Sequence, residues 1–289
     1  MYKEMSKELL SFIQKSPTAF HAVDQMKTIL KENGYQELLE GHKWHIQPGQ
    51  RYFVTRNNSS LIALNLGNQL EQYSFNVAAS HSDSPTFKLK ENAEVEVKGK
   101  YTQLNTEGYG GMICSTWFDR PLSIAGRVLV KDGENYITHL LKIDRDLVLI
   151  PNVAIHMNRS VNDGYAYNKQ VDLLPLFGTQ TKPGDLKKLI AAELGVNVAD
   201  ICGEDLYLYN RMAPSIWGAH EEFISSPQLD DLQCAFTSLK GFLKGSNDQS
   251  INVFACFDNE EVGSGTKQGA GSTFLYDVLH RINHALGKD

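Results

Sequence analysis

The pattern of apolar residues changes twice along the 289 residues of this chain, and that change constrains the fold more than any other feature. Helical stripes alternate with strand-like runs near both ends, whereas the stretch from about Phe87 to Leu149 holds only short alternating segments and turns. The first pattern is typical of an α/β domain and the second of β-strands. We therefore predict an α/β domain, residues 1–90 and 222–289, that is interrupted by a β-rich insertion, residues 91–221.

The last part of the chain shows the α/β pattern most clearly. Residues 229–245 (LDDLQCAFTSLKGFLKG) predict an amphipathic helix, and residues 251–258 (INVFACFD) predict a buried strand. Residues 272–286 predict another helix. Two more helices are expected within the first 35 residues, where Ser16 and Pro17 separate two apolar stripes.

Composition and charge exclude several classes of protein. The chain has 28 Lys and Arg against 34 Asp and Glu, a formal charge of -6, so the charge balance gives no reason to expect a nucleic-acid partner. No apolar run approaches the ~20 residues that span a bilayer, and no signal-peptide core opens the chain. Four cysteines without a CxxC pair fit neither a disulfide framework nor a structural zinc site. We expect a cytoplasmic globular protein without nucleic-acid or membrane partners.

Three segments place acidic or imidazole groups at a strand end or a helix start, where open α/β sheets build their sites. The first is AASHSDSP, residues 78–85. His81 leaves a buried strand there and could offer a neutral nitrogen to a metal, while Asp83 could accept its other N–H. On this segment alone, a loop histidine beside a turn-capping Asp83 is the simpler interpretation.

The second segment is SPQLDDL, residues 226–232, at the start of a predicted helix. Acidic residues in a first turn cap free N–H groups and complement the helix dipole, which explains Asp230 and Asp231 without any function. A carboxylate fixed at that position could instead bridge two metal ions.

The third segment, FDNEEVGS at residues 257–264, is the most specific, and a Gly-rich loop follows it. Glu260 and Glu261 would repel each other if they were buried without a cation. Neighbouring side chains of an extended backbone point to different sides, so one could bind a metal while the other acts as general base. A solvated acidic turn is the alternative.

Two weaker signals have ordinary explanations. The Gly-rich segment at residues 107–111 lacks the strand and helix of a nucleotide-binding loop. His280 and His284 have the spacing of a metal pair, but surface histidines near a helix C-terminus are more common.

The three segments, taken in this order, resemble the motifs of the M18 family of metalloaminopeptidases, the aspartyl aminopeptidase group. Residues 115–130 (STWFDRPLSIAGRVLV) and 150–159 (IPNVAIHMNR) are also similar to that family. The resemblance implies a phosphorylase/hydrolase-like α/β catalytic domain with an inserted β-rich dimerisation domain. It also implies self-association, as homodimers within dodecamers.

The same resemblance implies a two-zinc site. By matching positions, His81 would bind one zinc ion, Asp230 would bridge both, and Glu261 would bind the other. Asp83 would hold the ring of His81, and Glu260 would be the general base. A water shared by the two ions would lose a proton to Glu260 and attack the scissile carbonyl.

The implied substrates are peptides with a free N-terminus, from which the enzyme would remove the first residue, commonly Asp or Glu. His156, in VAIHM, matches a histidine that enters the substrate pocket of a neighbouring subunit.

One departure from the family concerns the region after Glu261. The family has there an aspartate in a segment of the SAD-x-AHA type and a later histidine, and each completes one zinc shell; this sequence has neither. Each zinc would then keep two protein ligands instead of the usual three. We expect an M18 protein that lacks the C-terminal part of its catalytic domain. The alternative functions are an inactive homologue that serves in assembly and, with little support, a nucleotide-binding protein.

Overall fold

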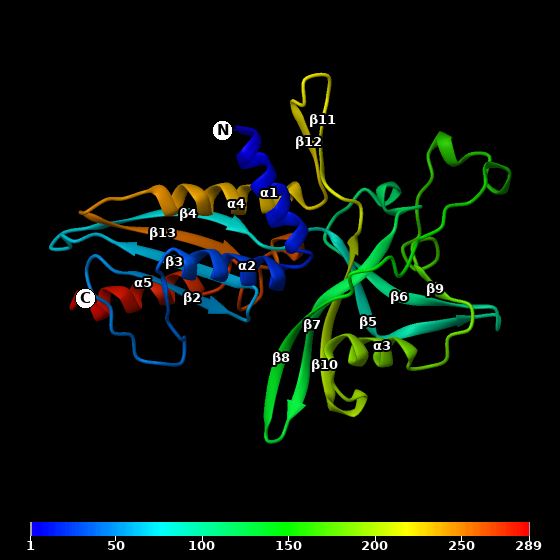
Figure 1. Ribbon diagram of the computed structural model, residues 1–289, viewed down its shortest axis with the longest axis horizontal. Coiled ribbons are helices and arrows are strands. Elements are labelled where there is room, and N and C mark those ends of the chain that lie inside the picture. Colours follow the sequence, from blue (N-terminus) through cyan, green and yellow to red (C-terminus); the bar gives the residue numbers. More distant parts are fainter. Residues whose placement is uncertain (1, 289) are drawn as a thin grey trace. The chain divides into compact units, whose positions relative to one another are not determined.

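A computed structural model describes residues 2–288 of the chain (Figure 1). Its internal contacts divide it into two compact units. We call Met1–Ser84 with Pro214–Asp289 the α/β unit, and Pro85–Ala213 the β-rich unit. The sequence predicts the two domain boundaries a few residues later, between residues 90 and 91 and between residues 221 and 222. The mixed α/β fold class is the one that the sequence predicts.

The α/β unit is built on a five-stranded sheet. Strand β13 runs parallel to β4 and antiparallel to β3, and β4 lies at the edge of the sheet. Strand β2 pairs antiparallel with β3 and parallel with β1. In sheet order the strands are β1 (Gln36–Glu37), β2 (Arg51–Arg56), β3 (Ser60–Leu66), β13 (Ser250–Phe257) and β4 (Ser74–His81).

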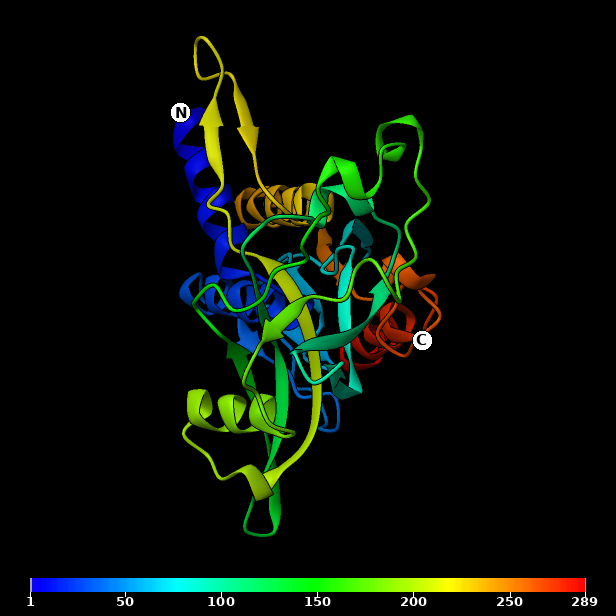
Figure 2. The same ribbon diagram turned by 90° about the vertical axis from the view of Figure 1, so that its right-hand side faces the viewer.

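Helices cover both faces of this sheet because the side chains of β13 alternate between them. Phe254 and Cys256 share one core with α1 (Tyr2–Lys15), α2 (Ala19–Glu32) and α4 (Leu229–Lys244). Val253 and Ala255 share the other core with α5 (Phe274–Ala285). Helices α1 and α4 lie side by side in both views (Figures 1 and 2), and the rings of Phe12 and Phe236 join them.

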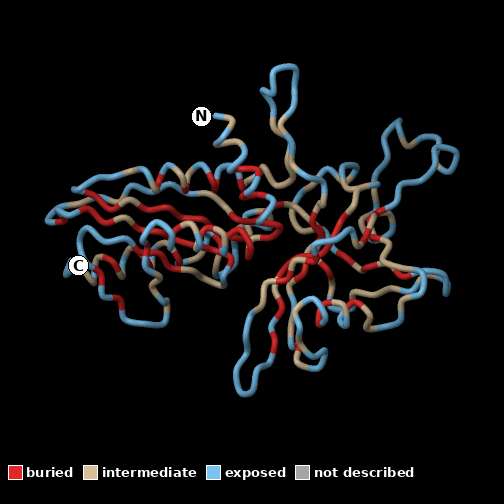
Figure 3. Tube along the Cα trace, viewed as in Figure 1, coloured by how far each residue is buried: buried red, intermediate tan, exposed pale blue. Residues whose placement is uncertain are grey.

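Burial differs sharply between the strands of this sheet. Most residues of β3 and β13 are buried, whereas β4 is exposed along most of its length (Figure 3). Beyond the sheet, β11 (Ser215–Trp217) and β12 (Phe223–Ser225) form a short antiparallel hairpin.

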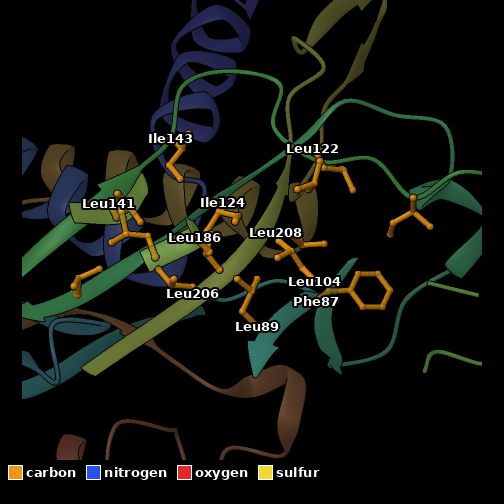
Figure 4. Packing of buried hydrophobic residues seen from close by; sticks show 14 of the residues in the cluster. Phe87, Leu89, Leu104, Leu122, Ile124, Leu141, Ile143, Leu186, Leu206 and Leu208 are labelled. Carbon is orange, nitrogen blue, oxygen red and sulfur yellow. The ribbon is translucent and has the colours of Figure 1, made fainter. Parts of the chain in front are cut away.

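The β-rich unit contains a six-stranded sheet in which every neighbouring pair is antiparallel. The order is β8 (Asn135–Lys142), β7 (Leu122–Asp132), β10 (Ile201–Asn210), β5 (Thr86–Val97), β6 (Tyr101–Tyr109) and β9 (Leu176–Gly178). Helix α3 (Asp185–Leu194) packs Leu186 into the same core as Phe87 and Leu104 (Figure 4). Four short 3-10 turns connect these elements: η1 (Cys114–Trp117), η2 (Ile155–Met157), η3 (Val161–Asp163) and η4 (Val198–Asp200). None of the helices within residues 2–288 combines the length and the apolar character that crossing a bilayer requires.

Candidate metal centre

The pairing of β4 with β13 brings two of the sequence motifs together. The strands are parallel, and His81, the last residue of β4, is in register with Phe257, the last residue of β13. Because parallel strands end at the same edge of a sheet, the residues after Phe257 lie next to His81. Glu260 and Glu261 then form a 3-10 turn, η5 (Glu260–Val262).

Asp83 connects these two strand ends. Its carboxylate is almost completely buried and accepts the backbone N–H groups of Glu260 and Glu261, each at 3.2 Å. The Nδ1 atom of His81 lies 3.3 Å from the Oδ1 atom of Asp83 and 3.1 Å from its backbone oxygen. Nδ1–H therefore points to Asp83, which leaves Nε2 as the nitrogen that faces the other carboxylates.

Asp230 and Asp231, at the start of α4, lie on the Nε2 side of His81. Nε2 is 3.5 Å from Oδ1 of Asp230 and 3.7 Å from Oδ2 of Asp231. The backbone of both aspartates is non-helical, and the carboxylate of Asp231 accepts the backbone N–H of His81 at 2.9 Å. Ser84 donates its hydroxyl to the backbone oxygen of Asp230 at 2.8 Å. The start of α4 is thus tied to the end of β4.

Within residues 2–288, two groups of three side chains bring candidate metal-binding atoms within 4.8 Å of one another, and His81 belongs to both. One group adds Asp230 and Asp231, and the other adds Glu260 and Glu261. Glu260 is the more open of the two glutamates: its side chain is 57% exposed, and its Oε2 lies 4.0 Å from Nε2 of His81.

The crowded carboxylates perturb the titration of their neighbours. Burial, followed by the charges of Asp83 and Asp230, raises the pKa of Glu261 to about 7. Burial opposes protonation of His81, but the hydrogen bond to Asp83 and the charge of Asp231 outweigh it and raise the pKa of His81 to about 9. Neighbouring carboxylates contribute to both shifts, and a bound cation would neutralise part of their charge.

Five of the six residues that the sequence named as site residues lie in this cluster: His81, Asp83, Asp230, Glu260 and Glu261. His156 lies in η2 of the β-rich unit, is exposed, and belongs to neither group of candidate ligands. His280 and His284 also belong to neither group, and the ring of His280 stacks on Tyr276 in α5.

Sequence reasoning did not assign a role to Asp231. The structure gives it contacts with both the backbone and the ring of His81. The sequence does contain an Asp-Asp pair at this position. In a regular first helical turn, however, the two carboxylates would point in different directions, so the pair did not predict that Asp231 reaches His81.

The fold and this cluster define a class: a mixed α/β protein with an imidazole and several carboxylates at the carboxyl ends of parallel strands, the ligand set of a metal-dependent hydrolase. A sequence model of the family described as Aminopeptidase I zinc metalloprotease (M18) matches residues 12–289. The chain belongs to the M18 family of zinc metalloaminopeptidases, as its motifs predict.

Similarity to two relatives and to a solved structure supports this family assignment. The chain is 46% identical to "Probable M18 family aminopeptidase 2" of Clostridium novyi (strain NT), over 99% of this chain and 68% of the relative. It is 37% identical to "Aspartyl aminopeptidase" of Dictyostelium discoideum, over 99% of this chain and 67% of the relative. It also matches the "Structure of S. cerevesiae mApe1 dodecamer" with a TM-score of 0.85 and 26% identity, over 98% of this chain and 67% of that one.

The chain therefore spans about two thirds of the length of these three proteins. The relatives are named aminopeptidases, so a metalloaminopeptidase function is favoured over a role in assembly alone.

Proposed function

We propose that this chain binds two zinc ions between His81 and the two carboxylate pairs and hydrolyses the N-terminal residue of peptides. The observation that carries the proposal is the position of His81, whose Nε2 faces Asp230, Asp231 and Glu260 at 3.5–4.0 Å. A carboxylate cluster alone is common on protein surfaces, but here it surrounds an imidazole in a member of a zinc peptidase family.

The chemistry of the donor set fits zinc. Zinc binds imidazole nitrogen and carboxylate oxygen, and both are present in each group of candidate ligands. Burial and the neighbouring charges of Asp83 and Asp230 raise the pKa of Glu261, and a bound cation would offset both effects. Within the described residues, His81, Asp230, Asp231 and Glu261 are the side chains that we expect to hold metal, with Asp230 as the bridge.

When bound, zinc would supply Lewis-acid chemistry, polarising the scissile carbonyl and acidifying the attacking water. Glu260 is the group we assign to proton transfer, because its carboxylate is open to solvent at the border of the cluster. It takes a proton from the water and returns it to the leaving amine. Asp83 keeps the ring of His81 and the backbone of the two glutamates in fixed positions.

The acidic cluster also suits the free amine of a peptide substrate. An ammonium group is attracted to several neighbouring carboxylates, which restricts cleavage to the first residue. We further propose a preference for acidic first residues, which the name of the Dictyostelium relative supports. His156 would contribute to that preference from a second copy of the chain.

Self-association is the last part of the proposal. The M18 match from S. cerevesiae is described as a dodecamer. The β-rich unit exposes several large apolar side chains, which an interface between copies would cover: Ile113, Val153, Ile155, Met157 and Val171. We also propose the cytoplasm as the location, since all four cysteines are free thiols.

The test combines metal analysis with an aminopeptidase assay on aspartyl and glutamyl substrates. We expect two zinc ions per chain, and a loss of roughly 10²–10⁴-fold in kcat for Glu260→Gln with zinc retained. Glu134→Gln, at the exposed turn between β7 and β8, is the matched control and should change neither quantity. A chain that binds no zinc, or a Glu260→Gln variant that retains full activity, would contradict the proposal.

A further inference from the structure

The turn that carries Glu260 and Glu261 begins at a residue to which the catalytic scheme gives no role, Asn259. Its backbone is left-handed, with φ of 62° and ψ of 27°. Its backbone oxygen accepts the N–H of Val262 at 3.3 Å and of Ser264 at 2.8 Å, and these bonds close the turn. The direction in which both glutamates leave β13 therefore depends on Asn259.

The side chain of Asn259 is anchored as firmly as its backbone. Its Oδ1 atom accepts the hydroxyl of Thr266 at 2.7 Å and the amide N–H of Gln268 at 2.8 Å. The backbone N–H of Asn259 is donated to the buried carboxylate of Asp258 at 2.8 Å. Asn259 is thus held from the Gly-rich loop on one side and from the end of β13 on the other.

The Gly-rich loop is itself held against the sheet, so it can act as a support. The backbone oxygen of Gln268 accepts the N–H of Asp258 at 3.2 Å and the hydroxyl of Ser60 at 2.6 Å. Arg56 donates to the backbone oxygen of Lys267 at 3.2 Å. The loop folds back so closely that a Cβ on Gly269 would lie 2.3 Å from the oxygen of Ser264.

Asparagine meets two requirements of this position together. Left-handed backbone is costly for most residues with a side chain, whereas Asn, Asp and Gly tolerate it. Of these, Gly offers no acceptor for Thr266 and Gln268, and Asp would add a further negative charge beside an acidic cluster.

We propose that Asn259 is a positioning residue: through Thr266 and Gln268 it fixes the turn that presents Glu260 and Glu261 to the metal and the substrate. The turn is then clamped from both sides, since Asp83 accepts the N–H groups of the two glutamates. The link to metal binding and catalysis rests on the proposed function, but the ordering of the turn does not.

Amide hydrogen exchange of the full chain, without added metal, tests this ordering directly. Asn259→Gly keeps a residue suited to left-handed backbone and removes the side-chain amide, including the oxygen that Thr266 and Gln268 contact. We expect the amides of Glu260 and Glu261 to exchange at least about tenfold faster, because the variant loses the two hydrogen bonds that Oδ1 of Asn259 accepts, while the amide of Val253 in β13 keeps its rate. Asn58→Gly is the matched control, because Asn58 is also left-handed, with φ of 56°, and lies in the turn between β2 and β3.

Two further variants separate the side chain from the backbone. Thr266→Val removes one donor to Asn259 and leaves the left-handed residue in place, so it should also speed exchange at both glutamates. Thr266→Ser keeps the hydroxyl and should restore protection. The proposal is overturned if the Glu260 and Glu261 amides of Asn259→Gly and Thr266→Val exchange within about twofold of the original chain. If Asn259→Gly does not fold, Thr266→Val decides.

Zinc affinity, measured by competition with a chromogenic chelator, links the turn to the site. Asn259→Gly and Thr266→Val should weaken binding by about 10–100-fold, as expected for groups that orient metal ligands, and Asn58→Gly should not. If the amides of Glu260 and Glu261 exchange faster but zinc affinity is unchanged, Asn259 orders the turn without positioning the metal ligands. An unmodified chain that binds no zinc would contradict the proposed function. The exchange experiment, done without metal, would still test whether Asn259 orders the turn.

Discussion

The carboxylate of Asp231 accepts the backbone N–H of His81 at 2.9 Å, so the first turn of α4 holds the last residue of β4. The same carboxylate lies 3.7 Å from the imidazole Nε2 of His81. One side chain therefore has both a structural contact and a place among the candidate metal ligands.

Replacing Asp231 separates these two contributions. Asp231→Ala should lower the free energy of unfolding by about 1.5–3 kcal/mol, the usual effect of losing a hydrogen bond to a charged group, and should weaken zinc binding. Asp231→Asn keeps an acceptor for the His81 N–H and should keep most of the stability while still weakening zinc binding. Urea unfolding and zinc titration of the two variants measure this. Equal zinc affinity in all three proteins would remove Asp231 from the metal site.

Metal removal should destabilise the α/β unit. Zinc at 100 times its Kd would add about 2.7 kcal/mol to the stability of the folded chain, so a chelator should lower Tm by several degrees. Differential scanning calorimetry with and without chelator measures the shift. The absence of any shift would indicate that the cluster does not hold zinc.

Glu261→Gln should have opposite effects on the metal-free and metal-loaded protein. At pH 8 it removes a charge that burial and the carboxylates of Asp83 and Asp230 disfavour, so Tm of the metal-free chain should rise by roughly 2 °C, the shift expected for about 1 kcal/mol. The stabilisation by zinc should decrease in the same variant. Glu134→Gln, on an exposed turn, is the control. A lower Tm of the metal-free variant would show that the charge of Glu261 does not destabilise the metal-free chain.

The acid stability of the β-rich unit should depend on Asp205 in β10. Burial raises the pKa of Asp205, but hydrogen bonds from Arg127 and Lys88 outweigh it and hold the pKa below its ordinary value of 3.8. Because the pKa is lower in the folded state, the stabilisation is complete above about pH 4–5 and is lost as the pH falls through the folded-state pKa. Asp205→Asn should therefore reduce stability at pH 7 and flatten its decline below pH 4, as measured by urea unfolding across pH.

Asp132→Asn, at the exposed end of β7, is the control for this pH series. An acid limb that stays as steep in Asp205→Asn as in the original chain would mean that other carboxylates are responsible.

Gly126 in β7 should not tolerate a side chain. A Cβ at this position would lie 2.0 Å from the backbone oxygen of Asp205 in the neighbouring strand. Gly126→Ala should therefore cost at least the 1–3 kcal/mol that is typical of overpacking. Gly203→Ala, where a Cβ would meet only Leu129 at 4.0 Å, is the control on β10. Unfolding free energies of the two variants, compared with the original chain, measure the difference.

The elements that sequence periodicity predicts are those with long, regular patterns. The run INVFACFD at residues 251–258 became β13 (Ser250–Phe257), shifted by one residue, and the amphipathic pattern from residue 229 became α4. These patterns are sufficient to predict the element because the spacing of apolar residues shows which face of the helix or strand is buried.

The pairing of strands was not accessible to the same reasoning. β4 pairs with β13 across about 175 residues, and no local pattern fixes that register. The roles of Asp231 and Asn259 could not be predicted for a related reason. Each residue acts through backbone that departs from regular helix or strand, and residue type alone does not determine those φ and ψ values. The short hairpin of β11 and β12, three residues each, is too brief to produce a periodic signal.

The edge position of β4 implies that a metal ion at this site would also hold the strand in the sheet. In the described residues β4 pairs with β13 on one side only, and it carries His81 at its end. Separation of this strand from the sheet would take the imidazole away from both carboxylate pairs at once. An ion held by His81, Asp230 and Glu261 would therefore work as a cross-link that fastens the outermost strand to helix α4 and to the turn after β13.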